Sequence, residues 1–74
     1  MVIYAIYNEY TKKWYTEDHK NPKGYTWSDF ESAKYWRTEA GRSKAWSRRR
    51  QLLEEQGFQK LDVKKFELRE IKDI

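Results

Sequence analysis

The sequence contains no cysteine, which excludes disulfide bonds and thiolate metal sites. Proline occurs once and glycine three times, so there is no glycine-rich phosphate loop. Long apolar runs are also missing. The longest, residues 1–6, is too short to cross a bilayer, and no charged segment of the kind that opens a signal peptide precedes it. The sequence therefore predicts a soluble protein of the cytoplasm that does not enter membranes.

Residues suited to catalysis are equally scarce. The only histidine, His19, lies beside Glu17 and Asp18 in a predicted loop, without the ring of ligands that a zinc ion needs. The serines have no other candidate base, and the carboxylates form no recognisable acid–base pair. We therefore expect no enzymatic activity, no cofactor and no metal site.

Charged and aromatic residues are abundant. Charged residues make up 38% of the 74-residue chain, and the mean hydropathy is −1.21, values that are also seen in disordered chains. Aromatic residues, however, reach 18%, with four Trp and six Tyr, and disordered chains are poor in these. The sequence predicts one folded domain over residues 1–74, with a core built from large rings.

The N-terminal part has the pattern of a β-hairpin. Residues 1–7 are β-branched and aromatic and are apolar at both alternating positions, which predicts a central strand. Residues 8–13 predict a turn, and residues 14–16 the returning strand. Residues 17–24 include the proline and predict a loop.

The region before the predicted helix is less regular. Ser28 and Glu31 have the spacing of a capping box, which predicts a helical turn over residues 29–33. Residues 33–37 predict a short third strand. Residues 61–71 alternate apolar and charged side chains and predict a half-buried strand at the edge of the sheet.

The helix has clear ends. Thr38 is a good N-cap, Glu39 suits the first turn, and Gly57 is a fitting residue after the last turn, so we predict a helix over residues 39–56. The predicted fold class is α+β. It is a small antiparallel sheet of three N-terminal strands plus a C-terminal strand, with one helix packed on one face, in the order β-β-β-α-β. The other face must be solvated or meet a partner.

The net charge of +4 comes from the middle of the chain. Residues 1–33 and 51–74 each carry a net −1, whereas residues 34–50 hold seven basic residues against one acidic residue. The seven basic residues are Lys34, Arg37, Arg42, Lys44, Arg48, Arg49 and Arg50. Such a local positive field attracts anionic partners, nucleic-acid phosphates above all. The alternative is that these side chains are solvated and cover apolar surface with their stems; Arg49 in particular could stack on Trp46.

The aromatic residues carry a second hypothesis. More rings are present than one helix can cover: Tyr10, Trp14, Tyr25, Trp27, Tyr35 and Trp36. Together with Lys12, Lys13, Lys34 and Arg37 they could form a platform on which bases stack. They could equally be core residues or a protein interface, since Trp, Tyr and Arg dominate both kinds of contact. Self-association through the uncovered sheet face is a further alternative.

Two resemblances bear on function. Residues 33–37 followed by Thr38 and a helix start rich in Ala, Gly and Lys resemble small uncharacterised proteins of phages and mobile elements. That resemblance implies a bacterial host cell and a role in host takeover, replication control or defence evasion, including inhibition of CRISPR nucleases. Three strands before a basic helix are also similar in layout to the DNA-binding domains of tyrosine integrases and to the AP2-type domains of plants, which read the major groove with the sheet face. The extra strand predicted at 61–71 departs from that layout.

We therefore expect a nucleic-acid-binding module, with DNA favoured over RNA. The alternative is an inhibitor or adaptor that binds an acidic host protein. The candidate binding residues are Lys12, Lys13, Trp14, Lys34, Tyr35, Arg37, Arg42, Lys44, Arg48, Arg49 and Arg50.

Overall fold

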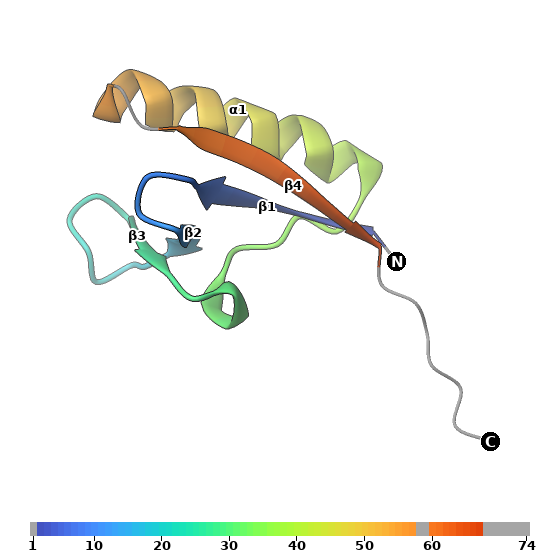
Figure 1. Cartoon of the computed structure of the whole chain (residues 1–74), viewed down its shortest axis with the longest axis horizontal. Coiled ribbons are helices and arrows are strands. Elements are labelled where there is room, and N and C mark those ends of the chain that lie inside the picture. Colours follow the sequence, from blue (N-terminus) through green and yellow to red (C-terminus); the bar gives the residue numbers. More distant parts are fainter. Residues whose placement is uncertain (1, 58–59, 68–74) are drawn as a thin grey trace.

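The computed structural model describes residues 2–57 and 60–67 (Figure 1). Within these residues the chain forms a four-stranded antiparallel sheet, one 3₁₀ turn and one long helix. The elements are β1 (Val2–Asn8), β2 (Lys13–Glu17), β3 (Tyr25–Ser28), η1 (Phe30–Ser32), α1 (Glu39–Gln56) and β4 (Leu61–Glu67). The predicted α+β fold and the order β-β-β-α-β are confirmed.

The sheet order is β3-β2-β1-β4, which places β1 in the interior and β4 at an edge, as predicted. β1 pairs with β4 over seven residues, from Val2↔Glu67 to Asn8↔Leu61. Its pairing with β2 is limited to Tyr7↔Trp14 and Asn8↔Lys13 at the hairpin end. β1 is buried on both faces because the sheet is covered on both sides along this strand. The predicted strand at 61–71 is observed as Leu61–Glu67, and residues 68–71 lie outside the described residues.

The hairpin turn is held by a buried asparagine. The Asn8 side-chain oxygen accepts hydrogen bonds from the backbone N–H groups of Tyr10 at 2.9 Å and Thr11 at 3.2 Å. Lys12 completes the turn with φ +60°, in the left-handed region. The turn predicted over residues 8–13 is therefore confirmed, with its rotation carried by an Asx-type side-chain contact.

The predicted third strand at 33–37 is wrong. The third strand is β3, which pairs with β2 from Trp14↔Ser28 to Glu17↔Tyr25. Residues 33–37 instead fill the gap that opens where β1 and β2 diverge. Trp36 and Tyr4 exchange two backbone hydrogen bonds of 2.8 and 2.9 Å, and the Lys34 N–H donates to the Tyr15 carbonyl at 2.9 Å. The segment is extended, as its composition indicates, but it forms a single bridge rather than a strand.

The predicted helical turn is present, but it lacks the predicted cap. η1 covers Phe30–Ser32, within the expected 29–33, and its N-cap is Asp29, with no side-chain hydrogen bond. Ser28 belongs to β3, where it pairs with Trp14. The capping box of Ser28 and Glu31 does not form because the strand takes the serine.

The helix begins and ends where the sequence predicts. The Thr38 hydroxyl accepts a hydrogen bond from the Gly41 N–H at 3.0 Å, and Gly57, at φ +76°, donates its N–H to the Leu53 carbonyl. Gly41 is required by a close approach, since a Cβ there would lie 2.8 Å from the Cβ of Trp36. The helix therefore lies tight against the segment that bridges to β1.

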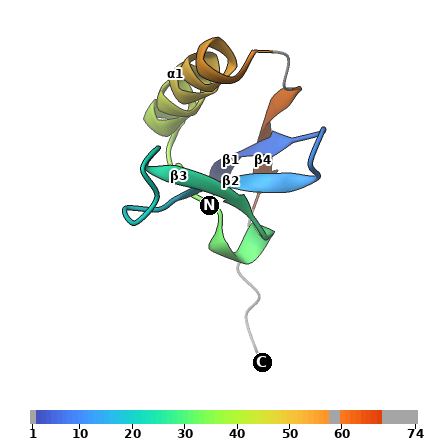
Figure 2. The same ribbon diagram turned by 90° about the vertical axis from the view of Figure 1, so that its left-hand side faces the viewer.

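The sheet separates two layers of side chains. Figure 2 shows α1 on one side of the sheet and the green η1 turn on the other. The helix side holds the buried core of Ile6, Tyr15, Tyr25, Leu52 and Leu61. The far side holds five packed rings, which we call the far-face ring cluster: Tyr7, Trp14, Phe30, Tyr35 and Phe66. The face that the single helix leaves open is thus partly covered by η1 and by residues 33–37.

Candidate nucleic-acid interface

The structure divides the predicted binding residues among several surfaces instead of gathering them on one. Lys34, Lys44 and Arg48 meet around one groove. Arg42 and Arg49 lie on the opposite flank of α1, whereas Arg50 is exposed on the same helix. The remaining residues lie at the hairpin turn, in the far-face ring cluster or before the helix: Lys12, Lys13, Trp14, Tyr35 and Arg37.

The groove runs between one flank of α1 and the strand layer. Its volume is about 420 Å³, and we call it the basic groove. The helix wall is formed by residues at helical spacing, Ser43, Lys44, Ser47, Arg48 and Gln51. The opposite wall is formed by Glu17, Lys34 and Trp36. Because these residues belong to one helix of 18 residues, the spacing between the cations and hydroxyls of the helix wall is fixed.

The electrostatics of the basic groove favour anions. Between residues 42 and 53 the helix carries five basic residues and no acidic one. Among the residues that the structure describes, Glu17 is the only carboxylate in the lining of the groove. Its Oε1 lies 3.9 Å from the Lys34 ammonium, and both side chains are substantially exposed, at 43% and 37%. A pair this long and this exposed contributes little, so it leaves the Lys34 charge available to a ligand.

Trp36, in the wall of the basic groove, belongs to a stack of rings and cations. Tyr15 and Trp36 stack with centroids 6.1 Å apart and planes 21° apart. The Arg48 guanidinium lies 5.9 Å from the Tyr15 centroid, and the Lys34 ammonium lies 5.9 Å from the Trp36 centroid. Arg48 also donates to the Gln51 side-chain oxygen at 3.0 Å. Both cations therefore lie near aromatic rings, and Lys34 also lies near the Glu17 carboxylate.

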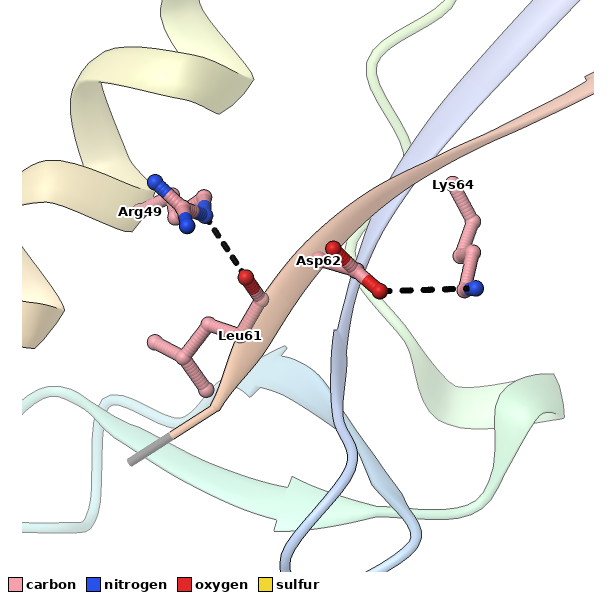
Figure 3. A network of polar contacts seen from close by, with 4 residues as sticks. All are labelled: Arg49, Leu61, Asp62 and Lys64. Atoms are coloured by element: carbon pink, nitrogen blue, oxygen red, sulfur yellow. Dashed lines mark hydrogen bonds and ion pairs between the residues drawn. The ribbon is translucent and has the colours of Figure 1, made fainter. Parts of the chain in front are cut away.

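The other flank of α1 has a structural role. The Arg49 Nε donates to the backbone carbonyl of Leu61 at 2.6 Å (Figure 3), and its guanidinium lies 5.1 Å from the Trp46 centroid. The expected alternative for Arg49, stacking on Trp46, is therefore confirmed. Because Leu61 lies at the free edge of β4, this contact also occupies an edge carbonyl that another strand could use.

The far-face ring cluster includes two of the predicted residues, Trp14 and Tyr35. Trp14 packs 4.8 Å from Tyr7 and 4.8 Å from Phe30, and the Tyr35 hydroxyl donates to the Phe30 carbonyl. An open depression of about 500 Å³ lies next to the rings. It is lined by Tyr7, Lys12, Trp14, Lys64 and Phe66. The Lys64 ammonium lies 3.6 Å from Asp62 (Figure 3) and 5.9 Å from the Tyr7 centroid. Four rings of the cluster are half-buried and Phe30 is exposed, so the cluster is a second small core that still meets solvent.

Several residues of these surfaces were missed as binding candidates. Ser47 and Gln51 fall at i+3 and i+7 from Lys44, and this spacing could have revealed them. Glu17 was missed, whereas Trp36 was expected in the aromatic platform. The pairing of β2 and the bridge at Tyr4 bring these two residues to the groove. Phe66 and Lys64 join the far face through the β1–β4 register.

Two buried tyrosines, Tyr4 and Tyr15, have a raised pKa. Burial raises the pKa of the Tyr4 hydroxyl, and the hydrogen bond that it donates to Glu39 Oε1 at 2.9 Å raises the pKa further. Burial also raises the pKa of Tyr15, against the opposing effect of the Arg48 charge. Both hydroxyls are therefore protonated at neutral pH and belong to the packing of the helix side.

The described residues offer no site for a metal. No group of three or more His, Cys, Asp or Glu side chains within 2–57 and 60–67 is placed to hold an ion. In the same residues, no helix is long and apolar enough to cross a membrane.

No protein-family model, no curated protein and no solved structure matches the chain.

Proposed function

We propose that this protein is a nucleic-acid-binding module that contacts phosphates with the basic groove. One observation carries the proposal: Lys34, Lys44 and Arg48 come from two separate segments and converge on one open groove, whose described lining contains a single carboxylate. Cations placed on a rigid element replace the counterions of a phosphate backbone, and their release drives binding. Hydroxyl and amide groups on the same wall add hydrogen bonds to phosphate oxygens.

The charges of the groove residues favour anion binding over the alternative that these side chains are only solvated. A solubilising helix mixes charges of both signs along its exposed face. Here Lys44 and Arg48 are one helical turn apart, about 6 Å along the axis, with no acidic residue on the same stretch of helix. The remaining helix cations extend the positive field around α1 and would steer an anionic strand toward the groove.

The proposal is tested by fluorescence anisotropy with labelled oligonucleotides across a range of salt concentrations. We expect binding at low salt that weakens with a log–log slope of about −0.7 to −0.9 per phosphate contacted. The double variant Lys44→Ala/Arg48→Ala should bind about tenfold more weakly or worse, because each charged hydrogen bond is worth roughly 1.5–3 kcal/mol. Its salt slope should also fall.

The matched control is Lys20→Ala/Lys23→Ala, which removes the same charge from the exposed loop between β2 and β3. This control should keep most of the affinity and the full slope. Equal losses in the two double variants would show that net charge alone, rather than the basic groove, attracts the nucleic acid. An absence of binding at low ionic strength would refute the proposal.

A second candidate function is binding of an acidic host protein through the far face. It is favoured by the half-buried rings Tyr7, Trp14 and Phe66 beside Lys12 and Lys64, because aromatic anchors ringed by cations are typical of protein interfaces. Pull-down from a bacterial lysate, with and without nuclease, separates a direct protein partner from one bridged by nucleic acid. Enrichment of one protein that survives nuclease and moderate salt, and that is lost on Trp14→Ala, would favour this function.

The same far face could join two copies of the chain. Such a dimer would bring Lys12 and Lys64 of the two copies together, and the repulsion between their like charges opposes face-to-face packing. Sedimentation equilibrium at increasing salt tests this: a dimer through the far face should strengthen as salt screens the lysines.

A further inference from the structure

The indole of Trp36 is an aromatic surface in the wall of the basic groove, and several contacts fix its position. Its backbone exchanges two hydrogen bonds with Tyr4, its Cβ packs against Gly41, and its ring stacks on the buried ring of Tyr15. These contacts fix the position of Trp36 from both the strands and the helix. The ring is only half-buried and lines the open groove, so part of it faces the space in which a ligand would lie.

The group nearest to that ring is weakly held. The Lys34 ammonium lies 5.9 Å from the Trp36 centroid and 3.9 Å from Glu17, and its side chain is 37% exposed. A long, partly exposed lysine can move its charge toward a phosphate while leaving the ring accessible. The ring therefore offers a stacking surface, and the lysine beside it offers a charge for the phosphate of the same nucleotide.

The opposite wall is built for phosphates. Lys44 and Arg48 stand one helical turn apart, with Ser47 between them and Gln51 one turn beyond Ser47. A strand lying along the groove would have its backbone on the helix wall and its bases toward Trp36. Glu17 on that second wall can accept a hydrogen bond from an exocyclic amino group of a base.

We infer that the basic groove takes unpaired nucleotides of a single strand, with a base stacked on Trp36 and its phosphates on Lys44 and Arg48. This inference rests on the proposed function and names its ligand class. In a duplex each base is stacked between its neighbours and its face is closed to an indole, so the stacking contact requires an unpaired base. A duplex could reach only the cations on the rims of the groove.

The test compares three labelled probes of equal length: a single-stranded oligonucleotide, the same sequence as a duplex, and a strand in which abasic sugars replace the nucleosides. We expect the single strand to bind more tightly than the abasic strand by about fivefold to a hundredfold, which is the value of one stacked base. The duplex should bind more weakly than the single strand, although it carries more phosphates.

Two tryptophan variants test whether the base stacks on Trp36. Trp36→Leu removes the stacking ring and should lower single-strand affinity severalfold, with little change for the abasic strand. Trp46→Leu removes an indole that is 43% exposed on the opposite flank of α1, and it should leave the affinity unchanged. Circular dichroism confirms that each variant is folded. If Trp36→Leu does not fold, the comparison of the three probes still decides, because it needs no variant.

The outcomes separate this inference from the proposed function. If the three probes bind equally and Lys44→Ala/Arg48→Ala weakens all of them, the groove binds phosphates without stacking, and the inference is overturned while the proposed function stands. Preference for the duplex would likewise overturn the inference alone. If none of the probes binds, both are refuted.

Discussion

The two faces of the sheet are built from similar aromatic residues but differ in how completely they are closed. On the helix side, α1 covers the sheet and leaves Ile6, Tyr15 and Leu52 at 0%, 2% and 1% exposure. On the far side the cover is a 3₁₀ turn and the extended residues 33–37, and Phe30 in that turn remains 38% exposed. A long element with small residues at its contact face closes a layer, whereas a three-residue turn cannot. Stability should therefore reside mainly on the helix side, and the far face should tolerate change.

The largest effect should come from opening the helix-side core. Leu52→Ala should lower the free energy of unfolding by about 2–5 kcal/mol, because it removes fully buried carbons and leaves a cavity. Phe66→Ala on the far face removes a larger side chain, but one already half in solvent, and it should cost less. Urea denaturation of both variants measures the difference. A greater loss for Phe66→Ala would reverse the ranking of the two faces.

A smaller loss is expected where the helix meets the bridge segment. Gly41→Ala places a Cβ 2.8 Å from the Trp36 Cβ, and the Trp36 backbone is held by Tyr4, so something rigid must shift. Overpacking costs about 1–3 kcal/mol, which exceeds the gain of about 1 kcal/mol from replacing glycine in a helix. The control Ser43→Ala, at an exposed position of the same helix, should be neutral or slightly stabilising. A higher melting temperature for Gly41→Ala than for the unsubstituted protein would contradict the close packing.

The positive charge of the basic groove can be increased by one substitution. Glu17→Gln removes the carboxylate that lines the basic groove and frees Lys34 from its weak partner. Under the proposed function, affinity for single strands should rise about twofold to fivefold at low salt, because an exposed charge contact is worth under about 1 kcal/mol. Glu9→Gln, in the exposed hairpin turn, makes the same charge change away from the groove and should have a smaller effect. A fall in affinity for Glu17→Gln would instead indicate that the carboxylate contacts the bases.

The smallest expected effect is a pH dependence that is specific to the helix side. The pKa of Tyr4 and of Tyr15 is raised above the ordinary value of 10.0, so the folded chain holds these protons more tightly than the unfolded chain does. Their contribution to stability is complete below pH 10 and is lost as the pH rises through the raised values. Tyr4→Phe should reduce this alkaline loss, as measured by urea denaturation at pH 8 and pH 11. An unchanged loss in Tyr4→Phe would show that Tyr4 does not couple to folding.

Local signals predicted the elements well where their ends are set locally. Thr38 and Gly57 mark the helix with side-chain and backbone contacts that span three or four residues. The strand prediction at 33–37 was wrong because its composition suits an extended segment, while strand formation depends on whether a partner runs alongside. β2 is paired by β3 instead, and Trp36 is left with one bridge to Tyr4.

The candidate site was predicted in part for the same reason. The cationic stretch of α1 is visible in the sequence, and helical spacing places Lys44 and Arg48 on one flank. The opposite wall comes from Glu17, which is 27 residues before Lys44, and from Trp36, which lies in the segment before the helix. Arg49 looked equivalent to its neighbours, but its hydrogen bond to Leu61 gives it a structural role.

By itself, the sequence determined the first, second and last strands, the bounds of the helix, the interior position of β1 and the concentration of positive charge in residues 34–50. These features follow from propensity, capping and periodicity, which act over a few residues. The tertiary structure alone decided which cations share a groove, which ring forms its wall and how the far face is covered. Those outcomes depend on strand register and on the divergence of β1 from β2, because contacts between distant segments are set by packing rather than by local preference.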